Sequence, residues 1–395
     1  MYSVNSLKDA YHRFMAWFGD FKYSHPSRKL FVIGVTGTKG KSLTIELINS
    51  VLKEAGEKTA VLSSVKEKIG DEEKRNKSGN TMPGRGYIQK FLSNATRAGV
   101  KYAILEVTSQ GVVQHRHEYI DWDAAICINL HPEHIESHGS FENYREAKLD
   151  FFRYAARSAK PRRMFFINKE DACADYFVKA AGDNEKYFFS GTFIKADFAA
   201  AEAVGRMLGI AEETIQKALR EFEGLPGRME VIREDPFKIV IDYAHTPDSL
   251  EEAYKTLGIQ LKIRKSPGRM ICVLGSAGGG RDKWKRPKMG EVAGRNCDYI
   301  IVTNEDPWDE DPMDIINTVA EAADKSGKPV LKILDRQEAI DKAVSEAGDG
   351  DVVIITGKGS ETAIRMSGGK ELPWSEREAV MKALADRNEL NEGLK

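Results

Sequence analysis

The sequence has no excess of charge of one sign, few cysteines and no long apolar run. Each of these features excludes a class of protein. The 59 basic and 60 acidic residues leave a net charge of −1, so bulk electrostatic attraction to nucleic acid or to a membrane is not expected. No apolar run is long enough to span a bilayer, and no signal peptide is recognisable. We therefore expect a cytoplasmic protein without nucleic-acid partners.

The four cysteines lie far apart in the sequence, and three of them end or follow apolar runs such as DAAICINL and RMICVLG. We interpret them as reduced core residues rather than as disulfide partners or zinc ligands. They are Cys127, Cys173, Cys272 and Cys297. Fixed-period repeats and low-complexity tracts are also absent, and 395 residues suffice for two or three domains with cores.

Aromatic residues crowd one short segment near the N-terminus, AYHRFMAWFGDF, residues 10–21. The crowded positions follow a helical pattern, and they are Phe14, Met15, Trp17, Phe18 and Phe21. Such a stripe usually packs against the helix's own domain, and we expect that here. Contact with a membrane surface or with a second copy of the chain is the alternative.

Short apolar runs alternate with helical patterns through most of the chain. The first series comprises FVIGV, TAVLSSV, YAILEV, AAICI and RMFFI, and the second comprises KIVIDYA, RMICVLG, DYIIVTN and DVVIITG. This alternation predicts mostly parallel sheets with helices on both faces, and Pro226 and Gly227 between the series are typical of a hinge. The predicted fold class is α/β, with an N-terminal aromatic helical segment (1–28), a P-loop ATPase-like domain (29–226) and a Rossmann-like domain (227–395).

The stretch FVIGVTGTKGKS, residues 31–42, joins a strand-like run to a helical pattern. It ends in Gly-Lys-Ser as a P-loop does, but Val35 replaces the first glycine of G-x-x-x-x-G-K-[ST]. A glycine-rich turn before a helix directs backbone N–H groups and the positive end of the helix dipole at an anion. Lys41 can then lie along the phosphates of a nucleotide, and the Ser42 hydroxyl can reach Mg²⁺. An ordinary glycine turn is the alternative.

A magnesium ion needs a hard oxygen ligand from outside this loop. Glu106 ends the apolar run YAILEV, and the carboxyl ends of parallel strands are where open α/β sheets bind their ligands. The densest polar segment is NLHPEHIESHGSFENYREAK, residues 129–148, which contains His131, Glu133, His134, Glu136 and His138. Its spacing fits no zinc site, so we expect it to serve magnesium and phosphates.

Seven motifs in a fixed order then carry a resemblance to a known family. They are GVTGTKGKS, EVTSQGVVQHR, NLHPEHIESHGSFENYREAK, LPGRME, DYAHTPDSL, GGGRDKWKRP and GKGSE. On these motifs the chain resembles the Mur ligase family, and within it the MurE type, over nearly its whole length. The resemblance implies an ATP-dependent, ADP-forming acid–amino-acid ligase of peptidoglycan-precursor synthesis. In such an enzyme a carboxylate takes the γ-phosphate of ATP, and an amino group then displaces phosphate from the acyl phosphate.

The resemblance also assigns roles to residues of this chain. The catalytic residues would be Lys41, Glu106, His134 and Lys148. Lys148 matches a lysine that is carbamylated in the family. A first Mg²⁺ would be held by Ser42 and Glu106 and a second by Glu106 and His134, and the carbamate of Lys148 would be a further metal ligand. ATP would be wrapped by Gly34, Gly37 and Gly40 and bound by Thr38, Lys39, Lys41, Ser42, Arg228, Asp242, Tyr243 and His245. The acceptor and the amino acid would be bound by Thr81, Gln114, Arg116, Arg281, Asp306, Gly357 and Glu361.

Four features depart from the family pattern. Only residues 1–30 precede the loop, so the family's uridine-nucleotide-binding N-terminal domain is expected to be missing. Ser360 stands where histidine is usual, and Ile194 replaces a usual asparagine, with Asp197 three positions on, so adenine contacts there are expected to differ. The amino-acid-selecting motif forms the fourth departure.

That motif is Asp-Asn-Pro-Arg in diaminopimelate-adding members and reads Glu305-Asp306-Pro307-Trp308 here. Tryptophan cannot pair with a distant carboxylate as arginine does, which disfavours meso-diaminopimelate. The acidic Glu305 and Asp306 favour a cationic amino acid such as lysine or ornithine.

Two other functions are consistent with parts of the sequence. Folylpolyglutamate synthetase-like or polyglutamate-type ligases share the two-domain layout, but their loop ends Gly-Lys-Gly-Ser, whereas this one ends Lys-Gly-Lys-Ser. The QHR and DYAHTPDSL segments also favour the MurE type. A non-catalytic ATP-binding partner subunit, docked through the aromatic helix, is the second alternative.

Overall fold

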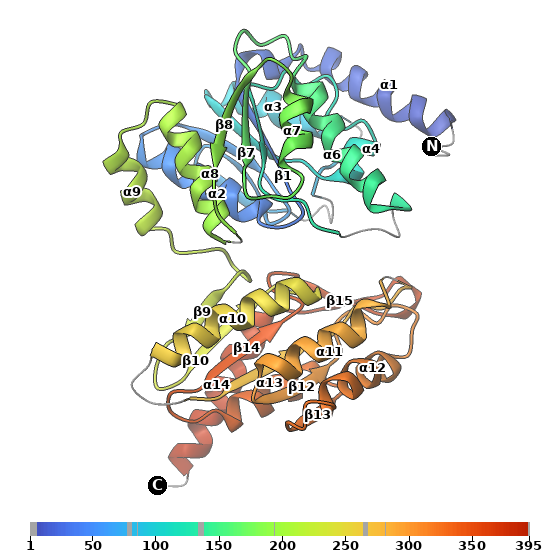
Figure 1. Ribbon diagram of the computed structural model, residues 1–395, viewed down its shortest axis with the longest axis vertical. Helices are drawn as coiled ribbons and strands as arrows, with labels where there is room; N and C mark the ends of the chain where they lie inside the picture. The colour runs from blue at the N-terminus through green and yellow to red at the C-terminus, as the bar shows by residue number, and fades with distance from the viewer. Residues whose placement is uncertain are drawn as a thin grey trace. The chain divides into compact units, whose positions relative to one another are not determined.

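The computed structural model describes residues 6–76, 81–84, 86–132, 138–192, 194–263, 268–280 and 282–393. The chain divides into two compact units, Met1–Glu223 and Gly224–Lys395, each built on its own sheet (Figure 1). The N-terminal helix α1 (Ser6–Lys22) and the short helix η1 (Pro26–Lys29) belong to the first unit.

An eight-stranded sheet forms the centre of the first unit, in the order β4-β3-β2-β5-β1-β6-β7-β8. The strands from β2 to β8 in this order run parallel, and β3 and β4 add an antiparallel edge. The strands are β1 (Phe31–Thr36), β2 (Thr59–Leu62), β3 (Lys66–Ile69), β4 (Glu72–Arg75), β5 (Tyr102–Glu106), β6 (Ala124–Cys127), β7 (Met164–Asn168) and β8 (Glu185–Phe189). The five predicted strands are confirmed as β1, β2, β5, β6 and β7. The sequence did not reveal β3, β4 and β8, because their charged residues hide the apolar pattern.

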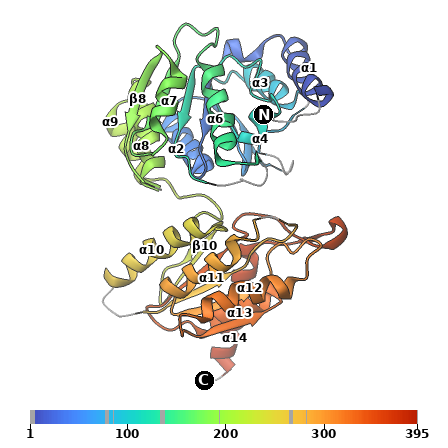
Figure 2. The same cartoon turned by 45° about the vertical axis from the view of Figure 1, so that its right-hand side comes forward.

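Helices cover both faces of this sheet. One face carries α3 (Tyr87–Arg97), α6 (Phe141–Ala155) and α7 (Ala174–Ala181), and the other carries α2 (Lys41–Glu54), α8 (Ile194–Met207) and α9 (Glu212–Arg220). Successive residues of a strand point to opposite faces, so Val32 joins one core and Ile33 the other. Figure 2 shows α2, α8 and α9 on one side of the strands and α6 on the other.

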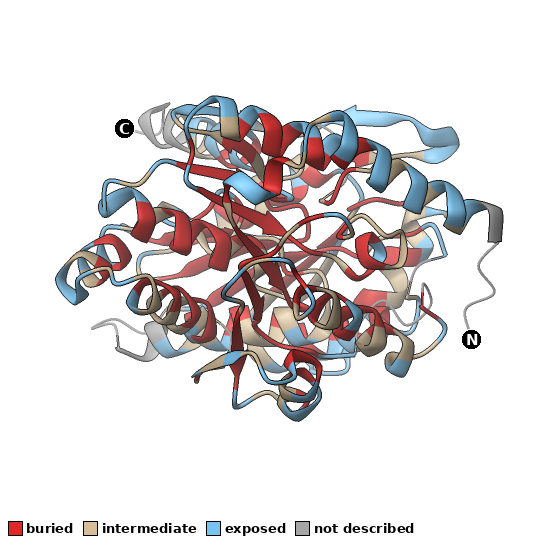
Figure 3. Ribbon diagram, turned by 90° about the horizontal axis from the view of Figure 1, so that it is seen from above, coloured by how far each residue is buried: buried red, intermediate tan, exposed pale blue. Residues whose placement is uncertain are grey.

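The second unit contains a six-stranded sheet in the order β13-β12-β11-β14-β10-β9, in which only β9 runs antiparallel. Its strands are β9 (Glu230–Arg233), β10 (Lys238–Asp242), β11 (Met270–Leu274), β12 (Tyr299–Thr303), β13 (Val330–Ile333) and β14 (Val352–Thr356). The four predicted strands are confirmed as β10, β11, β12 and β14. Figure 3 shows buried residues concentrated on the strands.

Helices cover both faces of the second sheet as well. Helices α10 (Pro247–Ile263), α11 (Lys285–Asn296) and α12 (Pro312–Asp324) pack on one face, and α13 (Arg336–Glu346) and α14 (Glu376–Gly393) on the other. A small hairpin of β15 (Ala363–Arg365) and β16 (Glu371–Pro373) follows β14, with the short helix η2 (Ser367–Gly369) in its turn. Within the described parts of both units, no helix combines the length and the apolar character needed to cross a membrane.

Two of the cysteines form a disulfide, so the prediction that all four are reduced is wrong. Cys272 on β11 and Cys297 at the end of α11 are bonded, with their Cα atoms 6.1 Å apart. Helix α11 runs back along the sheet and returns its C-terminal end to β11, a proximity that a separation of 25 residues does not reveal. Cys127 and Cys173 are free and buried.

Helix α1 packs against α3, but not through its aromatic stripe. Its inward side carries His12, Met15, Ala16, Gly19 and Asp20, so Met15 is the one member of the stripe that faces its own unit, and a Cβ on Gly19 would lie only 2.9 Å from the Cα of Gly86. Phe14, Trp17 and Phe18 lie on the exposed side. The prediction that the stripe packs against its own domain is therefore wrong for its four aromatic residues, because close approach of the backbone at Gly19 turns the large rings outward.

Candidate active site

The glycine-rich loop connects β1, which ends at Thr36, to α2, which begins at Lys41, at the carboxyl edge of the first sheet. Gly40 has a φ of 81°, and a Cβ there would lie 2.2 Å from Asp197 Oδ1. Asp197, on α8, is buried and accepts a hydrogen bond of 2.6 Å from the Thr44 hydroxyl. The aspartate therefore supports the loop and the first turn of α2 from behind.

Gly34 does not belong to this loop, although we expected it to wrap ATP. It lies inside β1, where a Cβ would meet Phe151 at 2.4 Å and Trp122 at 2.8 Å. Its role is close packing between the sheet and the aromatic side chains beneath it.

We expect Gly40→Ala to weaken ATP binding at least tenfold, because the added Cβ collides with Asp197 and the left-handed backbone is strained. Gly56→Ala is the matched control, since Gly56 follows the other end of α2 at a φ of 78° and has no heavy atom within 4 Å of the added Cβ. Isothermal titration with ATP and thermal unfolding compare the two variants. Equal ATP affinities for both variants would contradict this account of the loop.

Hydrogen bonds from a neighbouring strand end hold the loop in shape. The backbone N–H groups of Thr38 and Lys39 both donate to Asn129 Oδ1 at 3.0 Å, and Asn129 Nδ2 donates to Lys39 O at 3.2 Å. Lys41 Nζ lies over the same loop and donates to the carbonyl oxygens of Gly37 and Thr38 at 3.0 Å. Asn129 carried no predicted role of its own, although a polar residue just beyond a buried strand beside β1 was a usable signal.

Ser42 and Glu106 lie together as the sequence predicted. Glu106 ends β5 in register with Val35 of β1, and its Oε2 accepts from Ser42 Oγ at 3.0 Å and from the Ser64 N–H at 2.8 Å. The Ser64 hydroxyl, which the sequence analysis missed, lies 2.9 Å from that of Ser42. Two hydroxyls and a carboxylate form a set of hard oxygen donors, and this set fits Mg²⁺.

Lys148 on α6 is almost fully buried, at 1% exposure, and reaches the same loop. Its Nζ donates to Gly37 O at 2.7 Å and lies 3.4 Å from the Thr36 hydroxyl, while the Tyr144 ring packs beside it at 4.9 Å. Lys148 is therefore not a solvent-exposed lysine on the surface of α6. Its amine lies against the phosphate loop instead.

The histidine-rich segment is only partly described. Glu133, His134 and Glu136 lie outside the described residues, so the proposed metal ligand His134 has no geometry to report. His138 is buried, with Nε2 3.0 Å from Ser109 Oγ, whereas His131 is exposed. Among the residues that the structure does describe, no group of three or more His, Cys, Asp or Glu side chains is arranged to hold a metal ion.

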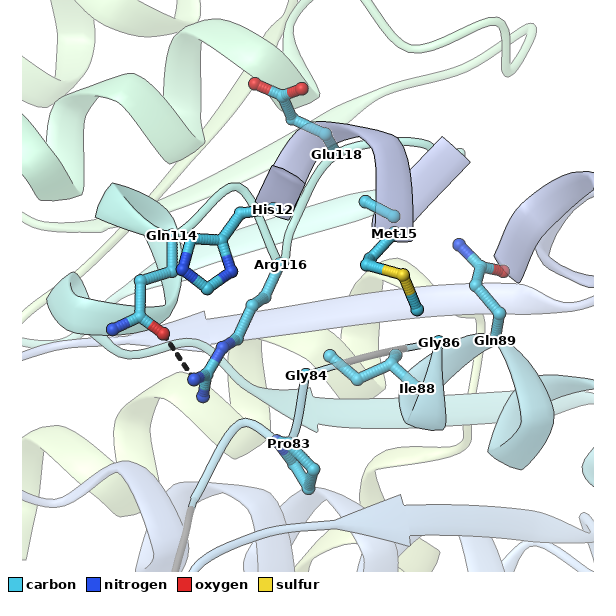
Figure 4. A pocket seen from close by; sticks show the side chains of 11 residues that line it. His12, Met15, Pro83, Gly84, Gly86, Ile88, Gln89, Gln114, Arg116 and Glu118 are labelled. Carbon is cyan, nitrogen blue, oxygen red and sulfur yellow. Dashed lines mark hydrogen bonds between the residues drawn. The ribbon is translucent and has the colours of Figure 1, made fainter. Parts of the chain in front are cut away.

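Gln114 and Arg116 line a pocket of about 30 Å³ in the first unit (Figure 4). Arg116 donates to Gln114 Oε1 and to Met82 O, the carbonyl next to Thr81. Thr81, Gln114 and Arg116, three of the expected acceptor-binding residues, therefore lie close together in the structure. Helix α1 adds His12, Met15 and Ala16 to the same wall, a contribution that the sequence analysis missed.

His115 ties α1 to this pocket. Its Nδ1 lies 2.7 Å from Glu118 Oε1, and its Nε2 bonds to Asp9 of α1. The hydrogen bond with Glu118, aided by Asp9, outweighs the effect of burial and raises the pKa of His115. The His115 side chain therefore bridges two carboxylates and anchors the helix beside Arg116.

In the second unit, Lys358 joins two of the predicted substrate-binding residues. Its fully buried ammonium lies 2.7 Å from Asp306 Oδ1 and 2.5 Å from Glu361 Oε2, and Glu361 Oε1 accepts from the Tyr243 hydroxyl at 3.2 Å. The lysine of GKGSE had no predicted role. Its place two residues beyond the end of β14, a fully buried strand, was the available signal.

The selecting motif itself is closed to solvent at its acidic positions. Asp306 is paired with Lys358, and Glu305 is buried, which raises its pKa because the charged form is poorly solvated. Trp308 lies against Gly279, and Arg365 packs 5.4 Å from the centre of its ring. Neither carboxylate is open to a cationic side chain, so the preference for lysine or ornithine loses its support. Arg281 lies outside the described residues.

The remaining predicted residues of the second unit cluster where β10 and β14 end. The Arg228 guanidinium packs 4.1 Å from the centre of the Tyr243 ring, and His245 Nδ1 lies 2.8 Å from Tyr243 O. Asp242 accepts from the Met229 N–H at 2.7 Å and so holds the turn that presents Arg228. Gly357 follows β14 with a φ of 110° and lies against Glu305.

A phosphate loop before a helix, a lysine over it and a serine–glutamate pair at the edge of a parallel sheet define a nucleotide-using α/β enzyme. Models of two domains match the chain: the Mur ligase middle domain over residues 35–216, and the Mur ligase glutamate ligase domain over residues 227–359. The chain belongs to the Mur ligase family. It is an ATP-dependent, ADP-forming amide ligase of peptidoglycan-precursor synthesis.

Similar proteins support this assignment. A UDP-N-acetylmuramoyl-L-alanyl-D-glutamate–2,6-diaminopimelate ligase of Geobacillus kaustophilus is 33% identical, over 95% of this chain and 83% of its own length. The Aquifex aeolicus ligase of the same name is also 33% identical, over 92% and 79%. A solved ligase of that name matches with a TM-score of 0.63 at 27% identity, over 95% of this chain and 83% of the other.

The folylpolyglutamate synthase of Mycobacterium tuberculosis matches with a TM-score of 0.66 over 87% of this chain and 92% of its own. At 15% identity this likeness concerns the fold alone. The sequence relatives therefore favour the MurE type over the folylpolyglutamate alternative.

Proposed function

We propose that this ligase extends an N-acetylmuramoyl dipeptide at a free carboxylate, as the name of its relatives states for UDP-N-acetylmuramoyl-L-alanyl-D-glutamate. The pocket of Gln114 and Arg116 is the observation that supports this acceptor. A guanidinium held in place by neighbouring carbonyl oxygens presents N–H donors in a geometry that matches a carboxylate. Because the reaction consumes ATP, we place the enzyme in the cytoplasm.

The reaction has two steps in this proposal. A carboxylate oxygen bonds to the γ-phosphorus while the bond to the bridging oxygen of ADP breaks. The amino nitrogen then bonds to the acyl carbon, phosphate leaves, and the nitrogen loses a proton. The phosphates would be surrounded by Gly37, Thr38, Lys39, Gly40 and the N-terminus of α2. The Lys41 ammonium, which donates to carbonyl oxygens of the loop, would donate to the phosphates instead.

Ser42 and Glu106, with His134 and a carbamylated Lys148, would hold Mg²⁺. The ion would supply positive charge beside the phosphates. Lys148 suits carbamylation in one respect, since its amine is buried beside the loop rather than dissolved in water. Addition of CO₂ to this nitrogen, with loss of a proton, would give a carbamate whose oxygens are the ligand type that magnesium prefers.

We propose that the second unit carries the amino-acid site and further nucleotide contacts. Arg228, Asp242, Tyr243 and His245 would contact the nucleotide, because they gather at the carboxyl edge of a parallel sheet. Asp306, Gly357, Glu361 and Arg281 would surround the amino acid, with Lys358 setting the positions of the two carboxylates. With Trp308 in place of arginine, the amino acid would be one other than meso-diaminopimelate.

A product assay tests this proposal. The full chain is incubated with ATP, Mg²⁺, UDP-N-acetylmuramoyl-L-alanyl-D-glutamate and single amino acids: meso-diaminopimelate, lysine, ornithine, alanine and glycine. ADP and the amide product are followed by liquid chromatography and mass spectrometry. We expect a new amide with at least one amino acid other than meso-diaminopimelate. Product with meso-diaminopimelate alone would overturn the specificity, and ligation of glutamate to a folate in place of this acceptor would overturn the acceptor.

A further inference from the structure

Five aromatic side chains of α1 form one continuous exposed stripe, which we call the aromatic face. Its members are Tyr11, Phe14, Trp17, Phe18 and Phe21, with exposures of 47, 53, 45, 41 and 63%. Spacings of three and four residues place them on one side of the helix. The rings also contact each other, since Phe14 stacks on Phe18 and Trp17 on Phe21, each pair at 5.9 Å. Single exposed aromatics are ordinary, but five on one side of a helix, four of them in two stacked pairs, indicate a binding surface.

The opposite side of α1 is already occupied. His12, Met15 and Ala16 line the pocket of Arg116, and Gly19 and Asp20 are buried. The helix therefore cannot rotate to bury its aromatic face without giving up these contacts. The exposed face is a consequence of how the helix is docked.

The cations of α1 are exposed to solvent, whereas its acids have partners within the unit. Lys8, Arg13 and Lys22 are exposed, and Arg13 also lies 3.9 Å from Asp9 Oδ2. The helix has two acids, and both are engaged by histidines: Asp9 bonds to His115, and Asp20 lies 2.5 Å from His25 Nδ1. Three exposed cations thus accompany the aromatic face, while the carboxylates of the helix are directed to partners within the unit.

We propose that the aromatic face binds an anionic lipid surface, with α1 lying in the plane of the membrane interface. Aromatic rings, tryptophan and tyrosine above all, are favoured at the level of the lipid headgroups. Lysine and arginine beside them attract anionic headgroups and keep their charged ends in water. The inference does not depend on which acceptor the enzyme uses. Because α1 also lines the pocket of Arg116, binding would hold that pocket close to the membrane surface.

A second copy of the chain fits this face less well. A two-fold interface would place the same residues of both copies against each other, so Lys8, Arg13 and Lys22 would face like charges. One face of a 17-residue helix is also small beside the area that a stable interface buries. An anionic lipid surface complements both the rings and the cations.

Sedimentation of the full chain with lipid vesicles tests the proposal. We expect binding to vesicles of phosphatidylcholine with 30 mol% phosphatidylglycerol to be at least tenfold stronger than to phosphatidylcholine alone, and to weaken as salt increases. Trp17→Ser combined with Phe21→Ser should reduce binding at least tenfold. Lys8→Gln combined with Lys22→Gln should reduce it only on anionic vesicles. Phe188→Ser, on β8, is the matched control, because Phe188 is also 53% exposed but lies outside α1.

Three outcomes would overturn the proposal. They are no binding to anionic vesicles, equal loss of binding with Phe188→Ser, and equal binding to neutral and anionic vesicles. A dimer seen by analytical ultracentrifugation without lipid, and lost with Trp17→Ser and Phe21→Ser, would assign the face to a second copy instead. The ADP production and thermal unfolding of the aromatic variants should match those of the unchanged chain. These controls separate failure of lipid binding from failure of the ligase assay.

Discussion

Replacing Lys148 by alanine will reduce ATP-dependent amide formation by roughly 10²- to 10³-fold, the loss typical when one preorganised group is removed from the site of developing charge. The side chain is buried and its Nζ contacts Gly37 O at 2.7 Å, so alanine at this position removes a buried amine from the phosphate loop. Steady-state ADP release and product formation measure the effect. Thermal unfolding checks that the variant remains folded.

Chemical rescue distinguishes two roles for this lysine. If a carbamate oxygen is what the reaction needs, formate or acetate should restore part of the activity of Lys148→Ala, because the truncated side chain leaves room for a small carboxylate. Lys148→Met is the matched control, since its longer side chain fills that space and should prevent rescue. Full activity of Lys148→Ala without any addition would remove Lys148 from the mechanism.

Replacing Lys358 by methionine will destabilise the second unit by roughly 3 kcal/mol, at the lower end of the cost of breaking a buried ion pair. Lys358 is fully buried, and its loss leaves Asp306 and Glu361 facing each other without a cation. We place the effect at the lower end because the Glu361 side chain is 36% exposed and water can solvate part of its charge.

Hydrogen exchange of the β12 and β14 amides measures this loss within the second unit, since a two-unit chain need not unfold in one step. The double variant Lys358→Met and Asp306→Asn should recover part of the stability, because it removes one of the stranded carboxylates. Unchanged protection in the single variant would show that the buried pair contributes nothing. A raised KM for the amino acid, with the KM for ATP unchanged, is the expected kinetic effect.

Much of the candidate site followed from the sequence because it depends on strand ends. Parallel strands place their carboxyl ends at one edge, so a serine after β1 and a glutamate ending β5 had to lie close together once the strands were recognised. Tyr243 and Glu361, which meet in the second unit, were assigned through the family resemblance instead. The pairing of Ser42 with Glu106 needed only the glycine-rich loop, the apolar runs and their order along the chain.

The missed residues share a different feature, since each acts through a partner far away in the sequence. Asn129 holds the backbone of Lys39, Asp197 supports Thr44, and Cys272 bonds to a cysteine at the far end of α11. No local pattern encodes these pairs. They depend on which helix lies over which strand and on how closely the backbones approach.

The sequence by itself determined the two α/β units, the phosphate loop and the family of ligases, because apolar periodicity and ordered motifs are local properties of the chain. Only the tertiary structure decided that Gly34 packs rather than binds, that Lys358 neutralises the selecting motif, and that α1 turns its rings outward. The physical reason is the same in each case. A side chain's role depends on the space and charge around it, and helices packed from distant parts of the chain set both.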